Sequence, residues 1–243
     1  MSKAWFDDWF NSLYYHTLYQ KRGSEEARQF IDALVAYLKP QASDHVLDLG
    51  CGRGRHAVYL HQLGYQVTGL DIAPKNIAFA QKSANDRLHF AVHDMRDPIF
   101  PKQYNLILNL FTSFGYFEED QTNQKVISHV ADALPKGGRF LIDFMNVDYV
   151  KTHLVPEETR TIAGIEFDIR RKFTGTAITK EIRFEADGGS YHFKEFVKAL
   201  QMSDFERYFE QAGLEICALM GNYQLEAFDA KQSERLIILT EKK

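Results

Sequence analysis

Between residues 45 and 144, short apolar segments alternate with longer segments in which apolar residues recur every three or four positions. The short segments have the length of strands and the periodic ones the length of helices. We therefore predict strands over 45–49, 66–70, 88–92, 104–109 and 139–144, and helices over 54–63, 74–84 and 118–134. Because strands that alternate with helices form parallel sheets with right-handed crossovers, the pattern indicates a doubly wound α/β domain.

After Asn146 the pattern changes. Strand-like stretches over 165–169, 178–184 and 191–200 are separated by two hairpin signals, 174–176 (TGT) and 187–190 (DGGS). Successive strands joined by short glycine turns predict an antiparallel meander inserted into the α/β domain. A helix over 203–212 and a hairpin pair of strands, 214–220 and 234–240, are expected to complete the sheet.

The first 40 residues read as helical. Aromatic residues spaced by three and four over 3–22 predict a helix with one apolar face, and a second helix is expected over 24–38, before Pro40. We divide the chain into a helical cap or lid (1–39), an α/β core (40–149), a β insertion (150–200) and the end of the core (201–243).

Composition narrows the classes of protein. The 243 residues are 45% hydrophobic and 26% charged, with a formal net charge of −4 and two cysteines. A dedicated nucleic-acid or membrane-surface binder carries a basic stripe, which this sequence lacks, so a small or neutral substrate is expected. Few cysteines and no signal-peptide pattern or long apolar run favour a cytoplasmic protein without disulfides.

The segment 46–54 (VLDLGCGRG) is an apolar strand that ends in an acid and three alternating glycines. Glycines of this kind let the backbone turn sharply and approach a ligand closely. A dinucleotide-binding loop needs a third glycine at position 55, where Arg55 stands. The alternatives are a different nucleotide-like cofactor or a glycine-rich turn without a ligand.

The pattern Asp48 to Gly54, acid-x-G-x-G-x-G, resembles motif I of class I S-adenosylmethionine (SAM) methyltransferases. The resemblance covers about residues 40–145 and 203–240 and implies a seven-stranded, mostly parallel sheet with an antiparallel last pair. In that family the acid at the end of the second strand, here Asp71, accepts hydrogen bonds from the ribose hydroxyls, and the acid after the third, here Asp94, accepts from adenine. The cofactor-binding residues that the resemblance implies are Asp48, Gly50, Cys51, Gly52, Gly54, Asp71, Ile72, Asp94, Met95, Asn109 and Leu110.

Other residues are candidates for the lid and for the acceptor pocket of such a site. In related enzymes the N-terminal helix covers the cofactor, which makes Tyr15 and Tyr19 candidates for cofactor-binding residues of a lid; core packing is the alternative. The candidates for the acceptor pocket are Phe111, Phe114, Tyr116, Arg183 and His192, the last two as part of a roof formed by the insertion. The candidates for a general base are His16, Asp143 and His192. The alternatives are plain core filling for the aromatic residues and the polar face of a sheet for Arg183 and His192.

Several kinds of chemistry are disfavoured. His89 and His93 are four residues apart on or just after a strand, too far to share a metal ion, and we expect no metal site. The segment 109–112 (NLFT) departs from the N-P-P-Y motif of DNA amino-methylases, so a flipped base is not expected as substrate. Cys51 is either a nucleophile or a small residue packed beneath the cofactor.

The sequence therefore predicts methyl transfer from SAM, with S-adenosylhomocysteine as product, to a small-molecule acceptor. A homodimer stays open as a further partner. The alternative functions are a nucleotide-binding oxidoreductase and a SAM-binding regulatory protein without turnover.

Overall fold

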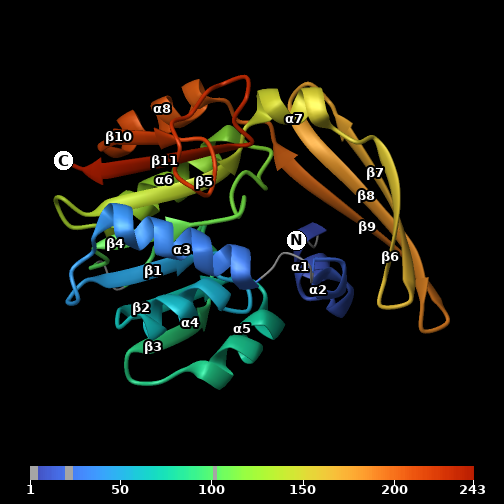
Figure 1. Ribbon diagram of the computed structural model, residues 1–243, viewed down its shortest axis with the longest axis horizontal. Coiled ribbons are helices and arrows are strands. Elements are labelled where there is room, and N and C mark those ends of the chain that lie inside the picture. Colours follow the sequence, from blue (N-terminus) through green and yellow to red (C-terminus); the bar gives the residue numbers. More distant parts are fainter. Residues whose placement is uncertain (1–4, 20–23, 101–102) are drawn as a thin grey trace.

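A computed structural model describes residues 5–19, 24–100 and 103–243 of the chain (Figure 1). The described strands form a seven-stranded sheet and a separate four-stranded sheet. The strands of the larger sheet are β1 (His45–Leu49), β2 (Gln66–Asp71), β3 (Leu88–Val92), β4 (Leu106–Asn109), β5 (Arg139–Met145), β10 (Leu214–Met220) and β11 (Arg235–Lys242). Their order is β10-β11-β5-β4-β1-β2-β3, and β11 runs antiparallel to both β5 and β10. The predicted doubly wound sheet with an antiparallel last pair is confirmed.

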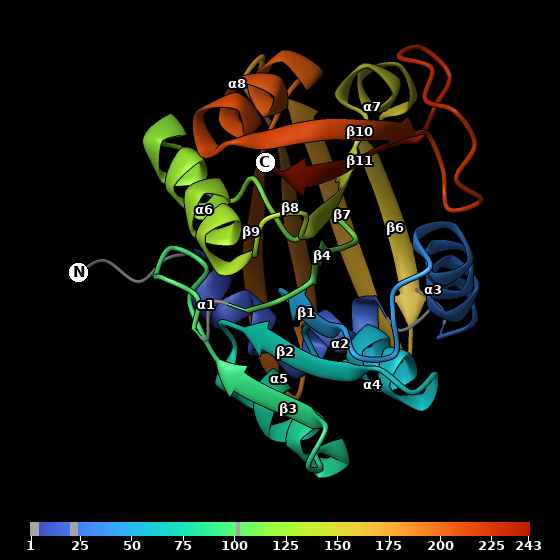
Figure 2. The same ribbon diagram turned by 90° about the vertical axis from the view of Figure 1, so that its left-hand side faces the viewer.

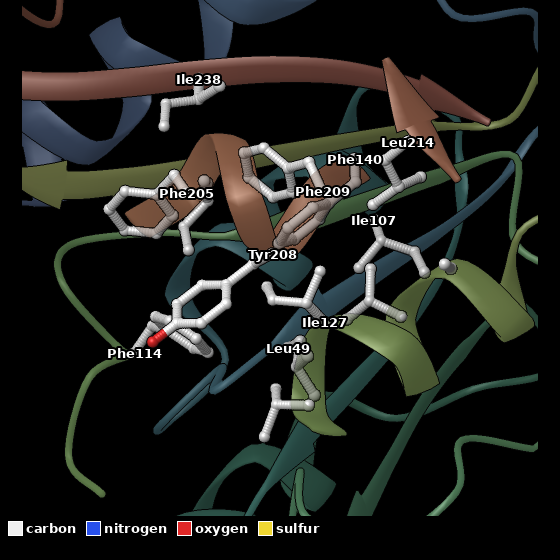
Figure 3. Close-up of a cluster of buried hydrophobic side chains, with 14 of the residues drawn as sticks. Leu49, Ile107, Phe114, Ile127, Phe140, Phe205, Tyr208, Phe209, Leu214 and Ile238 are labelled. Atoms are coloured by element: carbon white, nitrogen blue, oxygen red, sulfur yellow. The ribbon is translucent and has the colours of Figure 1, made fainter. Parts of the chain in front are cut away.

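Helices cover both faces of this sheet. The helices are α3 (Ser24–Leu38), α4 (Arg55–Gln62), α5 (Pro74–Ala80), which continues as the 3-10 turn Gln81–Ser83, α6 (Asp120–Ala133), α7 (Val147–His153) and α8 (Met202–Ala212). Neighbouring strand residues point to opposite faces, so Leu47 and Ile107 pack under α6 and α8, whereas Val46 and Leu106 pack under α3 and α4. Figure 3 shows the first of these two cores. The apolar strand segments of the sequence are thus buried on both faces, as a parallel sheet requires.

The four-stranded sheet is antiparallel, in the order β6-β7-β8-β9. Its strands are β6 (Glu157–Ile162), β7 (Ile165–Phe173), β8 (Ala177–Ala186) and β9 (Gly189–Lys198). The two predicted hairpin turns are present. Strand β6 and helix α7 were not predicted; β6 is an edge strand of sequence EETRTI, mostly exposed, and therefore lacks the apolar alternation on which the prediction depended.

The N-terminal segment differs from its prediction. Instead of one helix over 3–22, two short helices are present, α1 (Trp5–Phe10) and α2 (Leu13–Leu18). Ser12 separates them, because its Oγ accepts a hydrogen bond from the Tyr14 backbone N–H and caps α2. Positions 3, 4 and 20–22 of the predicted helix lie outside the described residues.

The two short helices pack on the inner face of the four-stranded sheet. Trp9 and Leu18 are buried in a cluster with Phe167, Ile182 and Phe184 of that sheet. Figure 1 shows α1 and α2 between the two sheets, and Figure 2 shows the small sheet behind the large one. Helix α3, which the sequence analysis grouped with the cap, instead packs against the large sheet together with α4.

Two smaller differences concern connections. Strands β10 and β11 are neighbours, but residues 221–234 join them through a long loop and not a tight hairpin. Strand β4 begins at Leu106, two residues later than predicted. Within the three described ranges, no helix is long and apolar enough to span a membrane.

Candidate active site

A cavity of about 410 Å³ lies at the carboxyl ends of β1, β2, β3 and β4 and extends beneath α1 and α2. The carboxyl edge of an open α/β sheet is where such folds bind ligands. The predicted site residues that line the cavity are Tyr15, His16, Tyr19, Gly50, Cys51, Gly52, Asp71, Ile72, Asp94, Met95, Leu110, Phe111 and Tyr116.

The glycine loop forms the floor of this cavity. Its first residues are fixed to the neighbouring strand, since the backbone N–H groups of Gly50 and Cys51 donate to the Leu70 carbonyl at 2.7 and 3.0 Å. Gly50 has φ +80°, and a Cβ there would lie 2.8 Å from Cβ of Ser113, so only glycine fits. At Gly52, with φ +55°, an added Cβ would meet no atom within 4 Å among the described residues, which leaves space for a ligand beside the backbone.

Asp71 ends β2 and faces the cavity. Its two carboxylate oxygens accept hydrogen bonds from the backbone N–H groups of Gly52 and Ala73, each at 2.8 Å. Burial raises the pKa of Asp71, and those two N–H donors oppose the shift. Each carboxylate oxygen accepts two hydrogen bonds, and Oδ1 also accepts from Asn76 Nδ2 at 3.5 Å. Asp71 therefore keeps one acceptor position, on Oδ2, for a ligand hydroxyl group.

Asp94 lies after β3, next to Met95. Its carboxylate accepts from Arg96 Nε at 2.9 and 3.0 Å and from the Arg96 backbone N–H at 2.9 Å. Burial alone raises the pKa of Asp94, but the Arg96 hydrogen bonds outweigh it and hold this pKa below its usual value. The Arg96 guanidinium also lies 5.8 Å from the ring centre of Phe6 and 5.3 Å from that of Phe117, at the edge of the cavity.

Residues of α2 cover the same space. His16 Nε2 is 2.7 Å from Asn76 Oδ1, and Asn76 Nδ2 reaches Asp71 at 3.5 Å. Burial, followed by the charge of Arg53, lowers the pKa of His16 to about 4, so its imidazole is neutral at pH 7. Tyr15 packs edge-on against His16 and Tyr19, and all three line the cavity.

Three predicted residues lie beneath the cavity wall instead of lining it. Asp48 is buried, with Oδ2 at 4.0 Å from Nδ1 of His56, and burial raises its pKa to about 7. Asn109 Nδ2 donates to the Leu49 carbonyl at 2.9 Å. Gly54 is the N-cap residue of α4, with φ +81°, and a Cβ there would lie 2.7 Å from the Phe90 ring. These residues shape the loop from below.

The structure does not bring four other candidates to the cavity. Phe114 lies in the hydrophobic core near Phe205 and Tyr208 (Figure 3). Asp143 is completely buried and paired with Arg235, with 2.6 Å between Nη2 and Oδ1. Arg183 and His192 face each other across β8 and β9, on the outer face of the small sheet. The expectation that they roof the pocket is wrong, because their neighbours Ile182 and Phe184 point inward and alternation turns Arg183 and His192 outward.

Cys51 is a buried residue of the cavity floor. Burial, followed by the charges of Asp48 and Asp71, raises the pKa of its thiol well above the usual value. A thiol that keeps its proton is a poor nucleophile, so the geometry favours the packing role.

Several residues that line the cavity were not among the predicted site residues. They are Phe6, Phe10, Leu49, Arg53, Arg55, His56, Leu70, Asn76, His93 and Ser113. The local signal for Arg53, Arg55 and His56 was their position in or directly after the glycine loop. The side chain of His56 stacks on the Phe111 ring at 5.1 Å, and its Nε2 has no hydrogen-bond partner among the described residues.

Among the residues that the structure describes, no group of three or more His, Cys, Asp and Glu side chains is placed to hold one metal ion.

Comparisons with known proteins agree on one family. Residues 46–138 match the family model described as a methyltransferase domain. A glycine/sarcosine N-methyltransferase of Parasynechococcus marenigrum is 21% identical over 201 residues, 79% of this chain and 71% of that one. The fold is similar to that of a SAM-dependent methyltransferase from Clostridium acetobutylicum, with a TM-score of 0.79, 18% identity and coverage of 94% and 96% of the two chains. It is also similar to SAM-bound CalS10, an amino pentose methyltransferase from Micromonospora echinaspora, with a TM-score of 0.71, 19% identity and coverage of 96% and 98%.

The matched residues 46–138 contain the glycine loop, Asp71 and Asp94. The fold of the whole chain is that of solved SAM-dependent methyltransferases. Residues 46–138 therefore form a methyltransferase domain, in a chain with the fold of class I SAM-dependent methyltransferases.

Proposed function

We propose that this methyltransferase transfers the methyl group of SAM to a small-molecule acceptor within the cavity beneath α1 and α2. The observation that carries the proposal is the composition of the cavity wall. The lining combines the glycine loop and the carboxylates of Asp71 and Asp94 with aromatic side chains from α1, α2 and the loop after β4. The polar groups suit a nucleoside, and the aromatic side chains suit a cationic, water-sensitive centre.

The residues present fit the cofactor. Asp71 Oδ2 would accept a hydrogen bond from a ribose hydroxyl, and Asp94 with Met95 would meet the adenine edge. The open space beside Gly52 would admit the methionine part, with Leu110 next to it. Asp48, Gly54 and Asn109 would act from below, by holding the loop in this shape.

When bound, SAM supplies a methyl group already activated by a positively charged sulfur. The task of the protein is then to orient the acceptor in line with the carbon–sulfur bond and to exclude water. Tyr15, Phe111 and Tyr116 line the cavity, and the faces of aromatic rings attract a sulfonium cation. Tyr19 and His16 would close the space above them.

We further propose that the methyl group goes to a nitrogen atom of the acceptor. Support comes from the glycine/sarcosine N-methyltransferase named above, and the amino pentose methyltransferase CalS10 is named for a substrate that carries an amino group. An unprotonated amine has its own lone pair and attacks without prior loss of a proton. This agrees with a cavity in which the pKa of His16 is too low for an efficient base at neutral pH.

The experiment is calorimetry with SAM, S-adenosylhomocysteine, NAD and NADP, followed by a screen of amines and amino sugars. We expect micromolar binding of the first two ligands and none of the others. The screen combines thermal shift in the presence of S-adenosylhomocysteine with mass spectrometry of reactions that contain SAM. A mass gain of one methyl group on an amine supports the proposal. Failure to turn over any acceptor despite tight SAM binding would favour a regulatory protein, and NAD binding without SAM binding would contradict the cofactor assignment.

A further inference from the structure

We propose that Asp143 and Arg235 are positioning residues, which hold the turn Phe111–Thr112–Ser113 against the cofactor cavity. The inference rests on the proposed function in one respect, that the cavity receives SAM. Neither residue lines the cavity, and neither touches the reacting atoms in the proposed arrangement.

The turn has an unfavourable backbone conformation. Phe111 and Thr112 have φ values of +56° and +59°, although both carry bulky side chains. L-residues avoid this left-handed region, above all two in succession, unless surrounding contacts hold them there. The turn follows β4 directly, at the edge of the sheet where the cavity lies.

Asp143 supplies the contacts that hold the backbone of the turn. Its Oδ2 atom accepts from the Phe111 N–H at 2.7 Å, and its backbone carbonyl accepts from the Thr112 N–H at 2.9 Å. Both N–H groups of the left-handed residues are therefore bound to one residue of β5. The carboxylate is completely buried.

Arg235 of β11 fixes that carboxylate and the turn together. Its Nε donates to Asp143 Oδ1 at 2.7 Å, and its Nη2 donates to Thr112 Oγ1 at 2.9 Å. The guanidinium group thus joins β11 to β5 and to the turn, across sequence separations of 92 and 123 residues. A planar group with several donors is suited to such a bridge, and a lysine reproduces only part of it.

The conformation of this turn sets the positions of three residues of the cavity wall, Phe111, Ser113 and Tyr116. The Phe111 ring stacks on His56 and lies 4.5 Å from the Arg55 guanidinium. Ser113 packs against Gly50 of the glycine loop, and the Tyr116 hydroxyl donates to the Thr112 carbonyl. A loosened turn would therefore disturb the wall where the methionine part and methyl group of the cofactor are expected.

The test compares Arg235→Ala, Arg235→Lys and Asp143→Asn with the unchanged protein, in the presence and absence of millimolar guanidinium chloride. The matched control is Arg170→Ala, which removes an arginine that is half exposed on the small sheet. We expect Arg235→Ala to weaken S-adenosylhomocysteine binding roughly tenfold or more, the scale of one lost charge-assisted hydrogen bond. Guanidinium should restore most of this loss in Arg235→Ala and change nothing in Arg170→Ala. The affinity of Arg235→Lys for S-adenosylhomocysteine should lie between that of Arg235→Ala and that of the unchanged protein.

Hydrogen exchange of the Phe111 and Thr112 amides provides a readout without ligand. We expect faster exchange in Arg235→Ala and Asp143→Asn, reversed by guanidinium only in the first. If these amides exchange as in the unchanged protein, or if guanidinium restores neither exchange nor binding, the positioning role is wrong. If the unchanged protein does not bind S-adenosylhomocysteine, the proposed function fails. The exchange measurement still decides whether Asp143 and Arg235 hold the turn Phe111–Thr112–Ser113. Should Arg235→Ala not fold, Arg235→Lys and Asp143→Asn carry the same comparison.

Discussion

At the scale of single residues, the site depends on a few acids held by backbone groups. Asp71 accepts from the N–H groups of Gly52 and Ala73, which fixes its orientation toward the cavity before any ligand binds. Asp48 has a different role, since it is buried beneath the loop beside His56. Asp71 therefore faces the cavity, whereas Asp48 supports the glycine loop from below.

The first prediction concerns Asp71. We expect Asp71→Ala to weaken S-adenosylhomocysteine binding by about 1.5–3 kcal/mol, the usual value of hydrogen bonds to a charged group. The measurement is calorimetry, with Asp132→Ala on the exposed side of α6 as a matched control. The loss should shrink for a ligand that lacks the ribose 2′-hydroxyl, because that ligand never made the full contact. Equal affinity of variant and unchanged protein would place the ribose elsewhere.

The second prediction concerns pH. Burial, followed by the charge of Arg55, lowers the pKa of His56 to about 3, far below the ordinary histidine value of 6.5. The unfolded chain therefore binds a proton that the folded chain does not, and His56 costs stability as the pH falls through 6.5. Asp48 acts in the opposite sense: burial raises its pKa to about 7, so its contribution becomes less favourable as the pH rises from about 4 to 7.

Replacing His56 removes one of these opposing contributions. When the pH is lowered from 7 to 5, the free energy of unfolding of His56→Gln should rise by about 2 kcal/mol relative to that of the unchanged protein. Urea unfolding at the two pH values measures it, with His192→Gln on the outer face of the small sheet as control. The same pH dependence in all three proteins would show that folding does not lower the pKa of His56.

At the scale of elements, the small sheet affects the cavity through α1 and α2. Glu195 of β9 accepts from Trp9 Nε1 and from the Tyr19 hydroxyl, each at 2.6 Å. Lys180 of β8 donates to the same Tyr19 hydroxyl and lies 3.8 Å from Glu195. Tyr19 lines the cavity, so the sheet positions a residue of the cavity wall without contributing Arg183 or His192.

The third prediction treats α1 and α2 as a lid. A lid must open to admit a ligand, so amides of residues 5–19 should exchange faster without S-adenosylhomocysteine than with it. Tryptophan fluorescence should change as well, since Trp5 packs edge-on against Tyr116 at 5.4 Å. Glu195→Ala should raise exchange in the bound state, whereas Glu195→Gln, which keeps one acceptor, should raise it less. Identical protection with and without ligand would mean permanently packed helices.

At the scale of the whole molecule, the two sheets are not hydrogen-bonded to each other, and Phe173, Ile178 and Val197 of the small sheet pack on one core of the large sheet. The cluster around Trp9 and Leu18 belongs to the small sheet, whereas α3 belongs to the large one. The large sheet has its own two cores, one on each face. It should therefore keep its fold without the small sheet, while α1 and α2 lose the surface on which they pack.

The fourth prediction follows from this division. Replacing residues 157–198 by a short Gly/Ser linker should leave a cooperative thermal transition of the large sheet, followed by circular dichroism. It should also weaken S-adenosylhomocysteine binding, because Tyr15, His16 and Tyr19 are no longer held over the cavity. Unchanged affinity would show that the small sheet contributes nothing to the cofactor side. Loss of the transition would show that it stabilises the core itself.

Features that depend on local pattern could be predicted from the amino-acid sequence without further information. Apolar strands in alternation with helices indicated the doubly wound sheet, and the spacing of Asp48, Gly50, Gly52 and Gly54 indicated the family. Asp71 and Asp94 could be placed from sequence because parallel strands end at one edge, so residues that follow successive strands lie close together. Each of these inferences needs only a chain segment and the general geometry of the fold.

Side-chain directions in the added elements, and the partners those side chains meet, became known only from the three-dimensional packing. Arg183 and His192 face outward because the inner face of β8 and β9 is occupied by α1 and α2. Phe114 belongs to the core because α8 packs over it. Asp143 is a partner of Arg235 because β11 inserts beside β5, a pairing between residues far apart in sequence. Such contacts depend on packing between segments far apart in sequence, and they therefore cannot be predicted from local periodicity.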